Sequence, residues 1–201
     1  MIGYADIFCL ATPIISRVVK PGYTGVACLF LLNDCDAMKT KILVSACLMG
    51  FKVRYNGQDK PLLADVLTRW QQEDRLVIHC PELAAGLSTP RLPAELVGGG
   101  GLAALNGSAN ILESDGTDVS QHYLLAACLA LKTAQESGCR LALMTDGSPT
   151  CGSLKIYDGT FQGRTQPGMG VATALLRQHG IEVYADSEIS ALIARIAELD
   201  G

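Results

Sequence analysis

Hydrophobic and polar residues along this chain favour short strands and amphipathic helices in alternation. Four short, largely apolar runs are typical of strands buried on both faces, at 42–45, 76–79, 141–145 and 181–184. Apolar residues spaced three and four apart predict helices at 62–72, 118–137, 171–179 and 187–199. Strands that alternate with helices imply a parallel sheet with right-handed crossovers. The pattern therefore predicts α/β architecture: a single Rossmann-like, three-layer domain with a mainly parallel sheet.

The segment 118–137 has the clearest helical period. Asp118 followed by Gln121 resembles a capping box, and Gly138 is expected to end the helix. Its predicted buried stripe consists of Leu124, Leu125, Cys128 and Leu131. By contrast, the segment 87–101 contains two prolines and four successive glycines, which predict a loop, either a mobile lid or a plain surface loop.

The first 38 residues differ from the rest of the chain. Their apolar residues have no clean period, and they contain two prolines and three cysteines. We expect a single α/β domain over 39–201, preceded by an N-terminal extension over 1–38. That extension is either an upstream segment from a mis-assigned start or a genuine appendage.

Composition narrows the classes of function. The chain has 201 residues, 49% of them hydrophobic, which suits one domain with a substantial core. A net charge of -4 and 5% aromatic residues disfavour both a phosphate-binding surface and a base-stacking platform, so no nucleic-acid polymer is expected as a partner. No secretory signal is evident and the apolar run 26–32 is too short to span a bilayer, so we expect a cytoplasmic protein without membrane contact. The oligomeric state is not predicted.

Three of the eight cysteines lie just past a predicted strand, each beside Gly or Pro. Cys47 is in Ser-Ala-Cys-Leu-Met-Gly, Cys80 in Cys-Pro-Glu, and Cys151 in Ser-Pro-Thr-Cys-Gly. Ligands of parallel sheets bind beyond the carboxyl ends of the strands, so three thiolates could converge there on a metal or iron–sulfur cluster with one open position. Cys128 and Cys139 instead fit small buried hydrophobes. The chain has no Cys-x-x-Cys pair, which disfavours a zinc ribbon or a thioredoxin-type site.

Several polar residues near these motifs are candidates for chemistry. Glu82, two residues after the second cysteine, could accept or deliver a proton, or could be an acid favoured at a helix start. Ser148 could orient substrate or water, or simply belong to a turn. Arg91 could hold a carbonyl or phosphate, although a solvated surface arginine is commoner. The glycines of 168–171 open a helix whose amides suit an anion or a carbonyl, and His79 is the histidine nearest the predicted site.

Six short motifs follow one another along the chain. They are Lys-Ile-Leu-Val-Ser-Ala-Cys-Leu-Met-Gly at 41–50, Arg-Tyr-Asn-Gly at 54–57, Cys-Pro-Glu at 80–82, Ser-Pro-Thr-Cys-Gly at 148–152, Ile-Tyr-Asp-Gly-Thr-Phe at 156–161 and Gly-Met-Gly-Val at 168–171. Together they resemble the thiouracil desulfidase family, small bacterial proteins long known only as a domain of unknown function. The resemblance covers about residues 39–190 and leaves out the first 38.

The resemblance implies a 4Fe-4S cluster held by Cys47, Cys80 and Cys151, with the fourth iron free of protein ligands. It also implies a non-redox reaction in which the free iron binds the sulfur of a thiolated uracil, and water replaces that sulfur to give uracil and hydrogen sulfide. Glu82 and Ser148 match family positions expected to transfer a proton and to orient substrate or water. The expected activity is an iron–sulfur-dependent thiouracil desulfidase that cleaves a C–S bond hydrolytically.

Three alternatives stay open on the sequence. The first is a desulfidase for thionucleosides or thionucleotides, with Arg91 or the turn at 168–170 holding ribose or phosphate. The second is a protein that binds zinc or a cluster without catalysis. The third is a soluble α/β domain whose cysteines are merely buried.

Overall fold

The structure, a computed structural model, describes residues 39–201. The expectations for residues 1–38, including Cys9, Cys28 and Cys35, lie outside the described residues. The elements in chain order are β1 Lys41–Ser45, the 3-10 turn η1 Ala46–Met49, α1 Asp65–Gln72, β2 Leu76–His79, α2 Pro81–Ala84, β3 Ala94–Val97, α3 Gly101–Leu105, β4 Asn110–Glu113, α4 Ser120–Glu136, β5 Cys139–Met144, β6 Lys155–Tyr157, β7 Thr165–Pro167, α5 Val171–Gln178, β8 Glu182–Ala185, the 3-10 turn η2 Asp186–Glu188 and α6 Ile189–Asp200.

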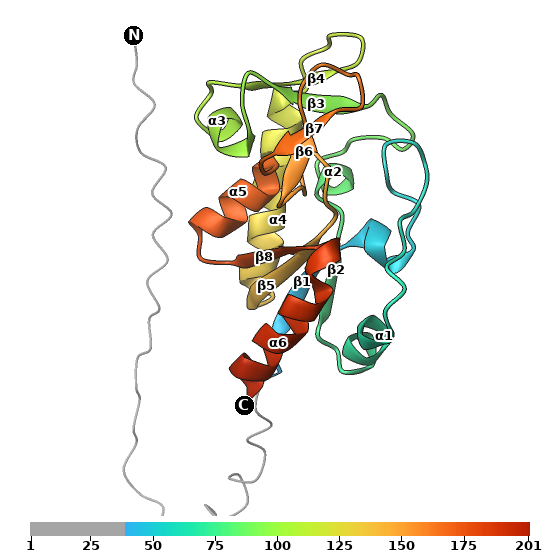
Figure 1. The fold of residues 1–201 in the computed structure, drawn as a ribbon, viewed down its shortest axis with the longest axis vertical. Helices are drawn as coiled ribbons and strands as arrows, with labels where there is room; N and C mark the ends of the chain where they lie inside the picture. The colour runs from blue at the N-terminus through green and yellow to red at the C-terminus, as the bar shows by residue number, and fades with distance from the viewer. Residues whose placement is uncertain (1–38) are drawn as a thin grey trace, which may run out of the picture. The chain divides into compact units, whose positions relative to one another are not determined.

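All four predicted strands form one parallel sheet. Its strand order is β2-β1-β5-β8, with β1 in parallel register with both β2 and β5 (Figure 1). Strands β1 and β5 are therefore central, and β2 and β8 form the two edges of the sheet. The predicted α/β class with a mainly parallel sheet is therefore confirmed.

Alternate residues of the central strands face two separate cores, which explains why the strands read as continuous apolar runs. Ile42 and Val44 of β1 are fully buried with residues of α1 and α6. Leu43 of β1 and Ala142 of β5 face the opposite core, which contains residues of α4 and α5. The sheet thus forms the middle layer of three.

The buried face of α4 differs from the predicted leucine stripe. Leu125 is 48% exposed, Cys128 is also exposed, and the predicted stripe is wrong at both positions. The buried residues of this helix are Tyr123, Ala126, Ala127, Ala130 and Ala134. Alanine side chains are short, so they let the α4 backbone pack closely in the core that it shares with Ala172 and Leu176 of α5.

Two predicted helix starts are also corrected. The Asp118 carboxylate accepts a 2.9 Å hydrogen bond from the backbone N–H of Ser120, two residues on, and Gln121 forms no capping box with it. The helix predicted at 62–72 begins at Asp65 instead. The backbone N–H of Leu62 donates to Leu48 O at 2.9 Å. This hydrogen bond holds Leu62 against η1 and outside the helix.

The glycine-rich segment is only partly the loop predicted over 87–101: residues 87–93 and 98–100 lie outside helices and strands, whereas the prediction is wrong for β3 and for the start of α3. It contains β3, which pairs with β4 in an antiparallel two-stranded sheet, and it leads into α3. Gly101 is buried, and its N–H donates to Met169 O at 2.7 Å. A Cβ added at Gly101 would lie 2.3 Å from Gly170 O, so glycine here permits close contact between two backbones.

Residues 158–161 lie in the connection of a β-hairpin. Strands β6 and β7 pair antiparallel on either side of the connection 158–164. Both of the two-stranded sheets have strands of only three or four residues, too short to give a clear alternating pattern.

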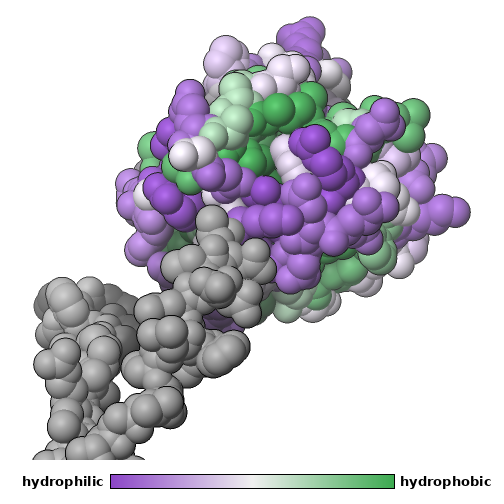
Figure 2. All heavy atoms as spheres, turned by 90° about the horizontal axis from the view of Figure 1, so that it is seen from below, coloured by the Kyte–Doolittle hydropathy of each residue, from purple (hydrophilic) through white to green (hydrophobic). Residues whose placement is uncertain are grey.

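The surface seen from below Figure 1 is largely hydrophilic, with hydrophobic residues gathered over one part of it (Figure 2). No helix among residues 39–201 has both the length and the apolar character needed to cross a membrane.

Candidate functional site

Three neighbouring strands end at one edge of the sheet, and each leads into a cysteine. Ser45 at the end of β1 is in register with His79 at the end of β2, and β5 lies on the other side of β1. Cys47 lies in η1 directly after β1, Cys80 directly precedes α2, and Cys151 lies in the loop after β5. The parallel strands therefore bring together three cysteines that are far apart in the sequence.

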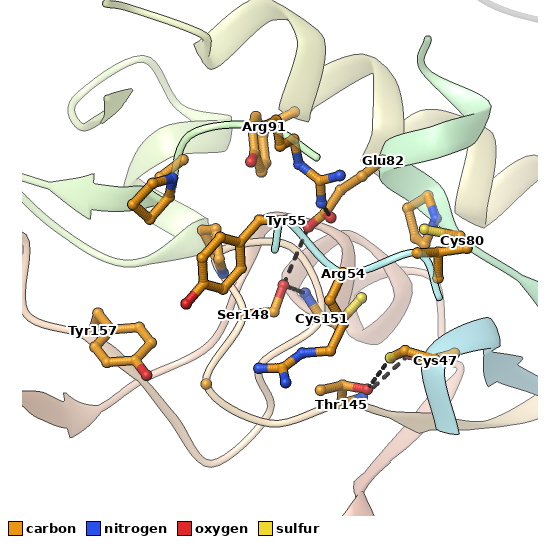
Figure 3. A pocket seen from close by; sticks show the side chains of 18 of the residues that line it. Cys47, Arg54, Tyr55, Cys80, Glu82, Arg91, Thr145, Ser148, Cys151 and Tyr157 are labelled. Carbon is orange, nitrogen blue, oxygen red and sulfur yellow. Dashed lines mark hydrogen bonds and ion pairs between the residues drawn. The ribbon is translucent and has the colours of Figure 1, made fainter. Parts of the chain in front are cut away.

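A cavity of about 320 Å³ opens at this edge, within the range of small-molecule sites. Its lining includes all five residues that sequence analysis singled out for cluster binding or catalysis: Cys47, Cys80, Cys151, Glu82 and Ser148. Figure 3 shows the three sulfur atoms on one side of the cavity, with Glu82 and Ser148 between them and two tyrosines. Residues predicted from separate motifs thus share one pocket.

The cysteines are free thiols in a largely desolvated setting. Cys47 Sγ and Thr145 Oγ1 share a 2.8 Å hydrogen bond. Burial raises the pKa of Cys47 and Cys80 above the ordinary thiol value. Burial also raises the pKa of Cys151, and the negative charges of Cys47 and Cys80 raise it further. The cysteines raise one another's pKa because the three sulfurs lie close together. A bound cation would offset this increase.

Glu82 lies at the centre of a buried polar network. Its Oε1 accepts hydrogen bonds from Thr150 Oγ1 at 2.6 Å and from Ser148 Oγ at 3.3 Å. Its Oε2 forms an ion pair with the guanidinium of Arg91. Because the Arg91 side chain is only 5% exposed, the solvated surface arginine expected for this position is wrong. Arg91 instead compensates the charge of the Glu82 carboxylate.

Ser148 holds the turn that presents Cys151. Its Oγ accepts 3.1 Å hydrogen bonds from the backbone N–H groups of Thr150 and Cys151. The turn role considered for Ser148 is therefore confirmed, and the same hydroxyl lines the cavity. One oxygen thus links the backbone of the cysteine loop to the Glu82 carboxylate.

Asp146 fixes the other end of this loop. Its Oδ1 accepts hydrogen bonds of 3.0–3.1 Å from three successive backbone N–H groups, those of Ser153, Leu154 and Lys155. Burial would raise the pKa of Asp146, but these hydrogen bonds outweigh it and hold the pKa below its ordinary value. The carboxylate is therefore ionised at neutral pH and ties both ends of the Cys151 loop together.

The start of α5 packs directly on the Cys151 loop. The backbone N–H groups of Gly170, Val171 and Ala172 donate to carbonyl oxygens of residues 149–152 at 2.9–3.0 Å. Of the two partners expected for these amides, an anion or a carbonyl, the structure shows carbonyls: the loop occupies the amides, so they are not free for an anion. A Cβ added at Gly170 would lie 2.5 Å from Thr150 O, so this glycine permits the contact.

Sequence reasoning missed several residues of the cavity. Arg54 and Tyr157 line it and belong to motifs that supported the family resemblance, yet neither residue was assigned a role. Thr145 directly follows β5, so its place at the strand end was a usable signal. Thr150 had no such signal, because its contact with Glu82 joins residues 68 positions apart.

The donor set of the cavity fits an iron–sulfur group better than one metal ion. Among residues 39–201, no three or more His, Cys, Asp or Glu side chains are close enough to hold a single ion, which disfavours a zinc site of these cysteines alone. Three soft sulfur donors around a larger open space suit a cluster of several atoms. The buried Nε2 of His79, which lines the same cavity, has no hydrogen-bond partner in the described structure.

Comparisons with known proteins agree with this geometry. The family model for 2-thiouracil desulfurase matches residues 42–188. The chain is 41% identical over 152 residues to the uncharacterized protein YbbK of Bacillus subtilis (strain 168), covering 76% of this chain and 99% of YbbK. It also resembles a solved structure of the [4Fe-4S]-dependent thiouracil desulfidase TudS, with a TM-score of 0.73 and 41% identity over 79% of this chain and 99% of that chain. The resemblance inferred from the six motifs is confirmed, and the chain belongs to the 2-thiouracil desulfurase family.

Proposed function

We propose that this protein removes sulfur from a thiolated uracil, converting it with water to uracil and hydrogen sulfide, at a 4Fe-4S cluster held by Cys47, Cys80 and Cys151. The observation that carries the proposal is the single cavity in which three cysteines from three adjacent strand ends face Glu82 and Ser148. Membership of the family and the likeness to TudS support the same activity. The reaction needs no external oxidant or reductant, since both hydrogens of the sulfide come from water.

The three cysteines would hold the cluster as thiolates. When bound, such a cluster supplies a Lewis-acidic iron without a protein ligand, which favours the soft sulfur of the substrate. Three negative thiolates in a buried site would be costly alone, as the raised pKa of each free thiol indicates. Cys47 also keeps a hydrogen bond with Thr145, which would orient its sulfur.

Glu82 is suited to proton transfer in this cavity. Arg91 neutralises the carboxylate through Oε2, whereas Oε1 lies with Ser148 and Thr150. We propose that Oε1 takes a proton from the attacking water and later releases it toward the departing sulfide. The Arg91 pair and the Thr150 hydrogen bond would hold the carboxylate in one orientation during both steps.

Ser148 is suited to orienting the reactants. Two backbone amides fix its oxygen, so its hydroxyl hydrogen has a defined direction toward Glu82. At 3.3 Å this hydrogen bond is long, and a water or a substrate oxygen could replace it without disturbing the loop. We propose that Ser148 positions the water that Glu82 deprotonates.

Cysteine variants of the full chain, purified without oxygen, test the cluster. Cys47→Ala, Cys80→Ala and Cys151→Ala should each lose the brown colour, the bound iron and sulfide release from thiouracil. Cys128→Ala is the matched control, because Cys128 is exposed on α4 and should leave all three unchanged. Wild-type protein without iron, or full iron and activity in any of the first three variants, would reject the proposed ligand set.

A second variant separates chemistry from cluster binding. Glu82→Gln should retain iron and visible absorbance but lose sulfide release, whereas Glu136→Gln on the exposed side of α4 should retain both. Because Glu82→Gln leaves the buried Arg91 charge unpaired, circular dichroism must first establish that the variant is folded. An active, folded Glu82→Gln enzyme would remove the proposed proton-transfer role.

A thiolated nucleotide is a second candidate substrate, favoured by Arg54. The Arg54 side chain lines the cavity, and among the described residues it forms no hydrogen bond or ion pair. Its guanidinium is therefore available for a phosphate. Arg91 and the turn at 168–170 are unsuited to that role, because the former is paired with Glu82 and the latter binds backbone carbonyls. Turnover of thiouracil, thiouridine and its monophosphate by wild type and Arg54→Gln would separate these substrates.

A further inference from the structure

The cavity gathers most of the aromatic side chains of the described chain. Residues 39–201 contain seven aromatic residues, and four of them line this cavity: Tyr55, Tyr123, Tyr157 and Phe161. Tyr123 is buried in the core, whereas Tyr55 and Tyr157 are 38% and 37% exposed. In a chain with so few aromatics, two half-open phenol rings in one pocket need an explanation other than core packing.

We propose that Tyr55 and Tyr157 form the surface that binds the flat face of the pyrimidine ring. This inference rests on the proposed function and adds the residues that select the substrate. In Figure 3 both rings lie on the opposite side of Ser148 from Cys47 and Cys80, so a ring held against them would face the sulfur side of the cavity. Substrate recognition and C–S chemistry thus occupy opposite sides of one pocket.

Tyr55 is held in place by its backbone. Its carbonyl accepts a 2.8 Å hydrogen bond from Arg91 N–H, and Arg91 is also the ion-pair partner of Glu82. The tight turn around it is closed by hydrogen bonds between Arg54 and Gln58 at 3.1 Å and between Gly57 N–H and Arg54 O at 2.8 Å. The tyrosine is therefore anchored to the same loop that positions the carboxylate.

Tyr157 is held by a different set of contacts, namely strand pairing and hydrogen bonds to a buried carboxylate. It lies in β6 opposite Thr165 of β7, at the start of the hairpin connection. Glu95 of β3 is 7% exposed, and its Oε2 accepts 3.0 Å and 3.1 Å hydrogen bonds from the N–H groups of Gly159 and Phe161. A buried carboxylate thus clamps the hairpin tip onto β3, so Tyr157 is fixed before any ligand binds.

The two phenol rings offer aromatic surface and little else. Neither hydroxyl makes a hydrogen bond within residues 39–201 in this structure, so these side chains are not held there for an internal polar contact. Stacking on an aromatic face favours planar conjugated rings and tolerates changes of the exocyclic group. A surface of this kind would accept a flat pyrimidine whether sulfur or oxygen is attached, and would disfavour a puckered, saturated ring.

Calorimetric titration of the cluster-loaded full chain tests the proposal, using uracil and 5,6-dihydrouracil as probes. Wild type should bind uracil more tightly than the puckered dihydrouracil. Tyr55→Leu and Tyr157→Leu should each weaken uracil binding about tenfold, as expected for loss of one stacking face, with little change for dihydrouracil. Tyr55→Phe and Tyr157→Phe should stay within about twofold of wild type, because they keep the ring.

Phe51→Leu is the matched control, since Phe51 is 51% exposed on the neighbouring loop but does not line the cavity. Wild-type uracil binding in both leucine variants, an equal loss for both probes, or no uracil binding by wild type would overturn the proposal. Sulfide release from thiouracil is measured in parallel. A wild type that binds uracil but releases no sulfide would reject the proposed function, while the leucine and phenylalanine comparison would still decide the role of the two tyrosines.

Discussion

The hydroxyl of Thr150 donates a 2.6 Å hydrogen bond to Oε1 of Glu82, and Thr150 is fully buried. Thr150 directly precedes Cys151, whereas Glu82 lies two residues after Cys80. One hydrogen bond therefore connects two of the three cysteine segments. It also leaves the carboxylate with a defined orientation, because Arg91 holds the other oxygen.

Thr150→Val should weaken catalysis without removing iron. Valine keeps the shape of the side chain but loses the donor, and a hydrogen bond to a charged group contributes about 1.5–3 kcal/mol. We expect sulfide release to fall by at least about tenfold, which corresponds to about 1.4 kcal/mol. Thr150→Ser keeps the hydroxyl and should recover most of the activity. Equal rates for the valine variant and wild type would show that this hydrogen bond does not position Glu82.

Asp146→Ala should loosen the Cys151 loop. The substitution removes the acceptor for three backbone N–H groups, so we expect a loss of about 2 kcal/mol in unfolding free energy. The rate at which a chelator extracts iron from the folded protein should also rise. Asp146→Asn retains an oxygen acceptor and serves as the control. Unchanged iron extraction in Asp146→Ala would mean that the loop keeps its shape without this carboxylate.

Gly170→Ala should displace the Cys151 loop by direct overlap. Its backbone has ordinary dihedral angles, so alanine meets no conformational strain, but the new Cβ would lie 2.5 Å from Thr150 O. We expect a loss of about 3 kcal/mol, at the upper end of overpacking effects, together with loss of iron. Urea unfolding and iron analysis measure both effects.

Gly180→Ala, just past the other end of α5, is the matched control. That glycine has a φ of 77° and no atom within 4 Å of an added Cβ, so only backbone strain of about 1 kcal/mol applies. Similar losses of stability in both variants, with iron kept in both, would show that close packing at Gly170 does not determine the shape of the Cys151 loop.

Asp200→Asn should reduce stability at neutral pH but not in acid. Burial would raise the pKa of Asp200, yet hydrogen bonds from Thr40 and Arg75 outweigh it and lower the pKa. A lowered folded-state pKa gives stabilisation that is present above the unfolded value of about 3.9 and is lost as the pH falls through the folded value. Urea unfolding at pH 7 and pH 3 should show a difference of about 1 kcal/mol that disappears at the lower pH. A difference that persists at pH 3 would contradict this linkage.

Much of the architecture follows from local sequence. The four apolar runs predicted the four parallel strands to within about two residues, since such runs suit strands buried on both faces. The placement of Cys47, Cys80 and Cys151 after three of these strands predicted one shared site, because parallel strands end at the same edge. Strand identity and position are encoded within a few residues, so the sequence by itself determined the sheet and which cysteines reach its edge.

Tertiary structure decided the rest, since those features depend on contacts between distant segments. Hydropathy favoured leucines for the buried face of α4, but close packing against α5 selected its alanines. Thr150 and Arg91 acquire their partner Glu82 only when the Cys151 loop and the 88–91 segment meet over α2. Likewise, Tyr55 and Tyr157 share a cavity only because Arg91 and Glu95 anchor two separate turns. No local period encodes such pairings, so the polar network and the aromatic surface emerged only from the folded chain.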